Sequence, residues 1–170
     1  MEIAALIVSV VALAASGIVS VRQLQLTEHS NTLPVLVDFF REHRGERLAQ
    51  ARQLIFDKSS VWDLSAGLEG LPEVERSLIR ELAWFYDNLG ALVTHGVVDI
   101  EPISGYLGGS VISVWEGLEP LVRAEREKRV QSGLPDTNRW QEYFENLYRL
   151  VKKFPPEQAR SQSPLWLPGN

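Results

Sequence analysis

Apolar residues recur at spacings of four and three along three long segments of the chain. This spacing places them on one face of an α-helix. The inward positions that it predicts are Leu78, Leu82, Phe85, Leu89 and Leu92; Leu107, Val111, Trp115, Leu118 and Val122; and Trp140, Phe144, Leu147, Val151 and Phe154. Each stripe predicts a long helix that packs into a bundle.

Two shorter helices precede these. The first is expected from about Leu33 to His43, and Gly45 breaks it. The second runs from Glu46 to about Lys58 and has an apolar face of its own. No segment alternates apolar and polar residues over the length of a strand, since Gly96 to Ile100, the nearest candidate, is too short to found a sheet. The pattern therefore predicts an all-α protein with a small bundle of about five helices.

Several residues mark the expected helix ends and bends. Asp99 is placed to cap the helix that starts at Ile100, and Pro120 should kink that helix. Gly96 suits a left-handed C-terminal cap, while Thr137 or Asn138 should cap the last long helix.

The N-terminus departs from this amphipathic pattern. Ile3 to Val21 contains no charged residue, and its 19 residues would span about 28 Å as a helix, against about 30 Å for the hydrocarbon core of a bilayer. A cleaved signal peptide is the alternative, but only Glu2 precedes the run, where a signal peptide has basic residues. The sequence predicts a single transmembrane helix that contacts membrane lipid through residues 3–21, with residues 1–26 forming an anchor and stalk.

The flanking charges predict the orientation of this anchor. Glu2 precedes it, whereas Arg22, Arg41 and Arg44 follow it. We expect an inner-membrane protein with its N-terminus outside and a helical bundle of residues 27–154 in the cytoplasm. The tail, residues 155–170, carries four of the nine prolines and is expected to be disordered.

Composition excludes several classes of chemistry. The chain has no Cys, which excludes a disulfide scaffold and a thiolate metal site, and its net charge of -5 argues against nucleic-acid binding. No two His residues lie four apart, the spacing that lets both bind a metal from one helix face. Gly105 to Ser110 is rich in glycine but lacks the lysine of a phosphate-binding loop, so Gly105, Gly108 and Gly109 are expected to let another helix approach. No catalytic, cofactor-binding or metal-binding residue is predicted.

Two features are candidates for interaction. Arg123 and Arg126 belong to a basic stripe that is either a solvated face or a site for phosphate or lipid headgroups. Trp166 lies in the apolar triplet Leu165-Trp166-Leu167 of the tail, which either folds back on the bundle or docks on a partner. An alternative site combines Asp87 and Asp99 with these arginines around the helix ends.

Several segments resemble an uncharacterised bacterial family of membrane-anchored helical proteins, a domain of unknown function. They are Leu36-Val37-Asp38-Phe39-Phe40, Phe85-Tyr86-Asp87-Asn88-Leu89-Gly90, Gly96-Val97-Val98-Asp99, Trp115-Glu116-Gly117-Leu118-Glu119-Pro120 with Arg123 and Arg126, and Tyr143-Phe144-Glu145-Asn146-Leu147. The likeness covers most of residues 1–154. It implies architecture and topology, and it brings no catalytic residue.

The leading hypothesis for function is a membrane-anchored helical interaction or scaffold protein without catalytic activity. Its partner would be another protein or a second copy of the chain. The alternative is a membrane-tethered ligand-binding or hydrolase-type domain that uses Asp87, Asp99, Arg123 and Arg126.

Overall fold

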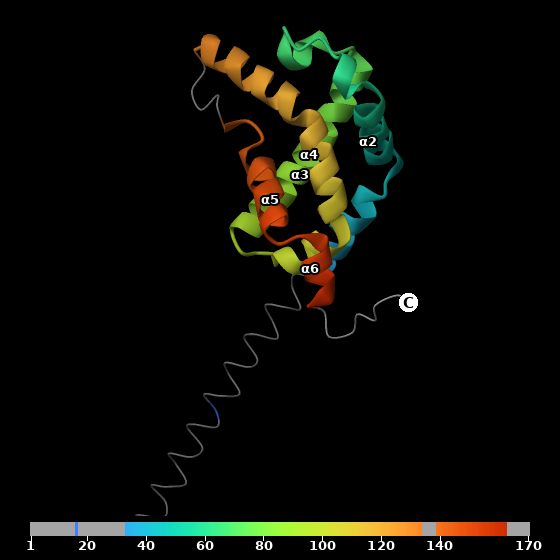
Figure 1. Ribbon diagram of the computed structural model, residues 1–170, viewed down its shortest axis with the longest axis vertical. Coiled ribbons are helices and arrows are strands. Elements are labelled where there is room, and N and C mark those ends of the chain that lie inside the picture. The colour runs from blue at the N-terminus through green and yellow to red at the C-terminus, as the bar shows by residue number, and fades with distance from the viewer. Residues whose placement is uncertain (1–15, 17–32, 134–138, 163–170) are drawn as a thin grey trace, which may run out of the picture. The chain divides into compact units, whose positions relative to one another are not determined.

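The computed structural model describes Ser16, residues 33–133 and residues 139–162 of the chain (Figure 1). Contacts divide the chain into two units, Met1–Phe40 and Arg41–Asn170. The predicted helix over residues 33–43 is present. The predicted boundary between residues 26 and 27 lies outside the described residues.

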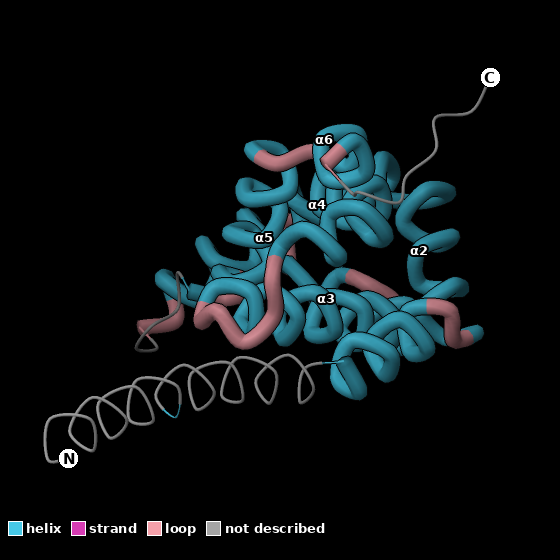
Figure 2. The backbone as a smooth tube through the Cα atoms, turned by 90° about the horizontal axis from the view of Figure 1, so that it is seen from below, coloured by secondary structure: helices cyan, strands magenta, loops and turns pink. Residues whose placement is uncertain are grey.

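The second unit is built from helices joined by short loops (Figure 2). Its elements are α2 (Glu46–Lys58), the 3-10 helices η1 (Ser59–Val61) and η2 (Gly67–Gly70), α3 (Glu73–Thr94), α4 (Ile100–Gln131), α5 (Glu142–Lys153) and α6 (Pro156–Ser161). No strand occurs in the described ranges 33–133 and 139–162. The prediction of a helical bundle is therefore confirmed.

The core forms where α3, α4 and α5 meet. All five apolar positions predicted in α4 are buried, as are Leu82, Phe85 and Leu89 of α3. The ring of Phe144 on α5 lies 4.7 Å from that of Tyr86 on α3 and 5.0 Å from that of Trp115 on α4, measured between centroids. These contacts tie the three helices together, because aromatic rings bury large apolar areas.

The predicted membrane topology is corrected. No helix among the described residues is both long and apolar enough to cross a bilayer. Both long helices, α3 and α4, bury one side and expose charged residues such as Arg80 and Glu116 on the other, as helices of a bundle do. This finding conflicts with the predicted N-terminal transmembrane helix and with the predicted single-pass inner-membrane location. The segment on which these two predictions are based, Ile3 to Val21, lies outside the described residues except for Ser16.

The start of the tail is ordered, contrary to the prediction. Pro155 precedes α6, and Pro156 is its first residue, where a proline costs no hydrogen bond. A Cβ atom on Gly108 would lie 2.7 Å from the Cγ atom of Pro156, so this glycine lets α6 approach α4. The close approach predicted for Gly108 is confirmed, whereas a Cβ on Gly109 would meet nothing within 4 Å.

The expected helix ends are partly observed. Gly96 follows α3 in the left-handed conformation, with φ of +68°. Pro120 lies inside α4, and Figure 1 shows this helix changing direction where its colour turns from yellow to orange. The last long helix starts later than predicted, with Gln141 at its N-cap position, while Thr137 and Asn138 lie outside the described residues.

Candidate functional site

The start of α5 is pressed against α3 at Gly90. A Cβ atom on this residue would lie only 2.2 Å from the carbonyl oxygen of Tyr143. Any other side chain would push the helices apart, because real Cβ contacts of this length do not occur. Gly90 therefore fixes where the first turn of α5 lies.

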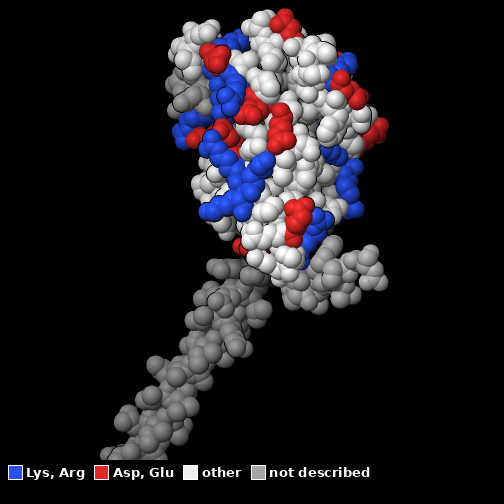
Figure 3. Space-filling view, viewed as in Figure 1, with Lys and Arg blue, Asp and Glu red and all other residues white. Residues whose placement is uncertain are grey.

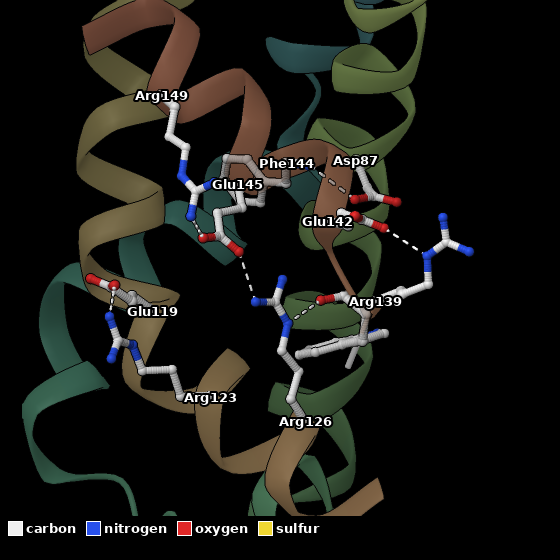
Figure 4. Close-up of polar contacts among 10 residues, drawn as sticks. Asp87, Glu119, Arg123, Arg126, Arg139, Glu142, Phe144, Glu145 and Arg149 are labelled. Atoms are coloured by element: carbon white, nitrogen blue, oxygen red, sulfur yellow. Dashed lines mark hydrogen bonds and ion pairs between the residues drawn. The ribbon is translucent and has the colours of Figure 1, made fainter. Parts of the chain in front are cut away.

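Asp87, one turn earlier on α3, caps α5 from outside that helix. Its Oδ1 atom accepts a hydrogen bond of 3.0 Å from the backbone N–H of Phe144 (Figure 4). The N-cap residue Gln141 makes no side-chain cap of its own. Burial raises the pKa of the Asp87 carboxyl, although the backbone donors of Phe144 and Tyr143 and the charge of Arg126 act in the opposite direction.

Arg126 on α4 is held in place from two sides. Its Nε donates to the carbonyl oxygen of Trp140 at 2.8 Å, and its Nη1 donates to Oε2 of Glu145 at 2.7 Å (Figure 4). The remaining nitrogen, Nη2, is buried and has no hydrogen-bond partner among the described residues. A buried guanidinium N–H without an acceptor is costly, so its retention needs an explanation.

Gln141, which follows Trp140 in the chain, also has unpaired buried polar atoms. It adopts the left-handed conformation with φ of 60°, the only non-glycine residue with positive φ in the described ranges. Its side chain is 2% exposed, and neither its amide nitrogen nor its amide oxygen has a partner there. Buried polar atoms without a partner among the described residues also occur away from this place, at Arg52 and Trp62.

A pocket with a volume of about 420 Å³ opens at this place. We call it the arginine pocket; it is lined by Thr94, Arg126, Arg139, Glu142, Tyr143, Glu145, Asn146 and Arg149. The volume lies within the range of ligand sites, about 300–1,000 Å³. Three guanidinium groups face two carboxylates in its wall, so the lining carries an excess of positive charge.

The carboxylates of the arginine pocket are paired with its arginines. Glu145 binds both Arg126 and Arg149, and Arg139 donates to Glu142 at 2.9 Å (Figure 4). The last pair is exposed on both sides, and such pairs contribute little to stability. Glu145 thus occupies the position between two guanidinium groups that a bound anion would take.

The predicted basic stripe is distributed between the surface and the pocket. Arg123 is exposed and pairs with Glu119 at 2.6 Å, outside the pocket lining. Arg129 pairs with Glu125, and its guanidinium lies 5.2 Å from the ring centre of Trp140. Basic and acidic side chains are mixed over the end of α4 and over α5 (Figure 3). Only Arg126 of the predicted arginines lines the pocket.

The structure does not bring the two predicted aspartates together. Asp99 is the exposed N-cap residue of α4, and its side chain makes no capping hydrogen bond. It precedes Arg126 by 27 positions, which corresponds to about 40 Å of helix at about 1.5 Å per residue. The alternative site of Asp87, Asp99, Arg123 and Arg126 is therefore not formed. Trp166 lies outside the described residues.

Sequence reasoning missed most of the arginine pocket. Arg139, Arg149 and Glu145 were not among the predicted site residues. One signal was available: Glu145 and Arg149 lie four apart on α5, the spacing of an ion pair on one helix face. The pairing of Arg126 with Glu145 joins two different helices, so no regular spacing in the sequence indicates it.

A second polar group, the histidine cluster, consists of His43, Tyr86 and Ser110. The Nε2 atom of His43 lies 3.1 Å from both hydroxyl oxygens, and these lie 2.7 Å from each other. Burial, followed by the charges of Arg52 and Arg44, lowers the pKa of His43 to about 4, and burial raises the pKa of Tyr86 to about 12. All three groups are uncharged at neutral pH. Such a cluster is better suited to holding helices together than to proton transfer.

The described residues contain no group of three or more acidic or histidine side chains that could hold a metal ion. No curated protein and no solved structure is detectably similar to the chain. A protein family described as a domain of unknown function, DUF4760, matches residues 2–154 and thus most of the helices that form the arginine pocket. The chain belongs to this family.

Proposed function

We propose that the protein is a non-catalytic interaction module that receives an anionic group of a protein partner in the arginine pocket. The observation that carries this proposal is a pocket with three arginines in its wall, of which Arg126 is fixed by hydrogen bonds to the backbone of Trp140 and to Glu145. An oxyanion in the pocket would accept charge-assisted hydrogen bonds from these guanidinium groups. Arginine suits this task because its planar group binds carboxylates and phosphates through two parallel hydrogen bonds.

The positions of the acidic groups favour binding over hydrolysis. Asp87 is already occupied as the cap of α5, and Asp99 is separated from the pocket by most of α4. A hydrolase-type mechanism needs an acid and a base close to one reacting bond. Binding needs only the fixed guanidinium and the open pocket.

The proposal is tested by the melting temperature of the full-length chain in sodium phosphate, citrate and glutamate, compared with sodium chloride at equal ionic strength. A ligand that binds only the folded state raises the melting temperature by mass action. We expect at least one of the three anions to stabilise the natural protein more than an Arg126→Gln variant.

Arg123→Gln is the matched control. It removes the same charge from the same helix, but Arg123 does not line the pocket. This variant should respond to the anions as the natural protein does. If all three proteins are stabilised equally, the effect is the general exclusion of these salts from protein surfaces, and the proposal is wrong.

A further inference from the structure

The arginine pocket contains an anion of its own. Glu145 lies between two arginines, with its Oε2 atom 2.7 Å from Nη1 of Arg126 and its other oxygen on Arg149. This carboxylate is only partly exposed, at 23%. It fills the place where the guanidinium groups of α4 and α5 converge.

The two sides of this ion pair differ in their freedom to move. Arg126 is fixed by its second bond, from Nε to the backbone of Trp140. Among the described residues, the carboxylate of Glu145 is held by the side chains of the two arginines, so a rotation about its own side-chain bonds releases it. An incoming anion therefore displaces Glu145 and leaves Arg126 where it is.

We infer that Glu145 is a built-in occupant of the pocket and that the ligand which replaces it is a phosphate monoester on a partner protein. This inference rests on the proposed function and names the regulation and the ligand of the same site. A monocarboxylate offers the two arginines the same chemistry as Glu145, but without the advantage of belonging to the same chain. It should not compete.

A phosphate monoester has what a carboxylate lacks. It carries a charge of about -1.5 to -2 at pH 7 and has three acceptor oxygens. Two of them bind Arg126 and Arg149 in place of Glu145, and the third can accept a hydrogen bond from Arg139, which also lines the pocket. The pair of Arg139 with Glu142 is exposed to water on both sides, and such pairs contribute little to stability.

The test uses the full-length chain and titration calorimetry with three probes: a phosphoserine peptide, the same peptide with glutamate in place of phosphoserine, and inorganic phosphate. Glu145→Gln removes the competing charge and keeps the shape of the side chain. We expect this variant to bind the phosphoserine peptide roughly tenfold more tightly than the natural protein, which corresponds to about 1.4 kcal/mol. It should also bind the glutamate peptide, which the natural protein should not.

Glu119→Gln is the matched control, because it removes the same charge from a neighbouring pair outside the pocket lining. Its affinity for the phosphoserine peptide should equal that of the natural protein. Circular dichroism checks that each variant is folded. If Glu145→Gln does not fold, Glu145→Asp replaces it, since the shorter side chain keeps the charge but reaches the two arginines less well, and tighter binding is expected again.

The outcomes separate the two proposals. If the natural protein binds the phosphoserine peptide and the Glu145 variants bind it equally or less well, Glu145 is not a competitor and this inference is wrong, while the proposed function stands. If inorganic phosphate binds as tightly as the peptide, the source of the ligand is free phosphate and the assignment to a partner protein is wrong. If neither the natural protein nor the variants bind any probe, both proposals fail.

Discussion

The arginine pocket and the histidine cluster are both polar, but they differ in how their polar groups are arranged. In the histidine cluster, three uncharged groups from three helical segments satisfy one another within hydrogen-bond distance. In the arginine pocket, charged groups surround an open volume. The first arrangement stabilises the fold, whereas guanidinium groups beside an open volume can exchange their carboxylate partners for a bound anion.

The largest expected effect on stability comes from a substitution in the aromatic core that both regions share. Trp115 is 2% exposed and packs on Phe144, whose ring also contacts Tyr86 of the histidine cluster. Trp115→Ala should reduce the free energy of unfolding by about 3–5 kcal/mol, because a buried cavity replaces the ring. Urea denaturation measures this change. An unchanged midpoint would show that the aromatic core does not support the two regions.

The next effect is specific to the histidine cluster. Tyr86→Phe deletes a buried hydroxyl and leaves Ser110 and His43 incompletely paired, which should cost about 1–3 kcal/mol of unfolding free energy. Tyr148→Phe is the control, since its hydroxyl binds the exposed Glu116. A similar loss in both variants would remove the distinction between a closed buried network and a surface contact.

A smaller effect on stability is expected at the contact between α3 and the start of α5, which forms part of the pocket wall. Asp87→Ala leaves the backbone N–H of Phe144 without its acceptor and should cost about 1 kcal/mol, as the loss of a helix cap does. Asp87→Asn keeps an acceptor oxygen and avoids the burial of a charge, so its cost should be smaller. Thermal unfolding compares the two variants. Equal losses would mean that the charge, and not the cap, is what α5 needs.

Acidification should affect the two regions in opposite directions. The pKa of His43 is lowered in the folded state, so its contribution to stability is lost as the pH falls from about 6.5 towards about 4. The pKa of Asp87 is raised, so the folded state takes up a proton more readily and gains stability as the pH falls towards 3.8. Melting temperatures of His43→Gln and Asp87→Asn across this range separate the two contributions. The same pH dependence in both variants and in the natural protein would contradict these assignments.

The smallest effect is expected outside both regions. Arg123→Gln breaks an exposed pair with Glu119, and pairs of this kind are screened by water and salt. The melting temperature should not change measurably, in contrast to the other substitutions. A clear loss would mean that the surface of α4 takes part in the pocket's support.

The long helices were predictable because their packing faces repeat along the sequence. The stripe through Leu107, Val111 and Trp115 is buried as expected, since spacings of three and four fit a single helix face. Helix α6 was missed because two prolines and polar residues usually end a fold. Its place depends on the absence of a side chain at Gly108, a contact about fifty residues away in sequence that no local pattern reveals.

The candidate site could be predicted only in part for the same reason. Asp87 and Arg126 were singled out, and both form hydrogen bonds to residues at the start of α5. Their roles depend on Phe144 and Glu145, which belong to another helix. The histidine cluster was not predicted, since its three residues come from three separate segments and each alone resembles an ordinary polar position.

The hydrogen bond between Phe144 and Asp87 provides a reporter of motion within the bundle. The third backbone N–H of an isolated helix has no acceptor within that helix, so it exchanges rapidly with water hydrogen. In this protein the Phe144 amide has an acceptor on α3. Its exchange rate therefore measures how often α5 separates from α3, independently of whether α5 itself stays helical. We expect the Phe144 amide to exchange slowly and to exchange faster in Asp87→Ala, while the later amides of α5 are unaffected. Its exchange rate would then report how often this wall of the pocket opens.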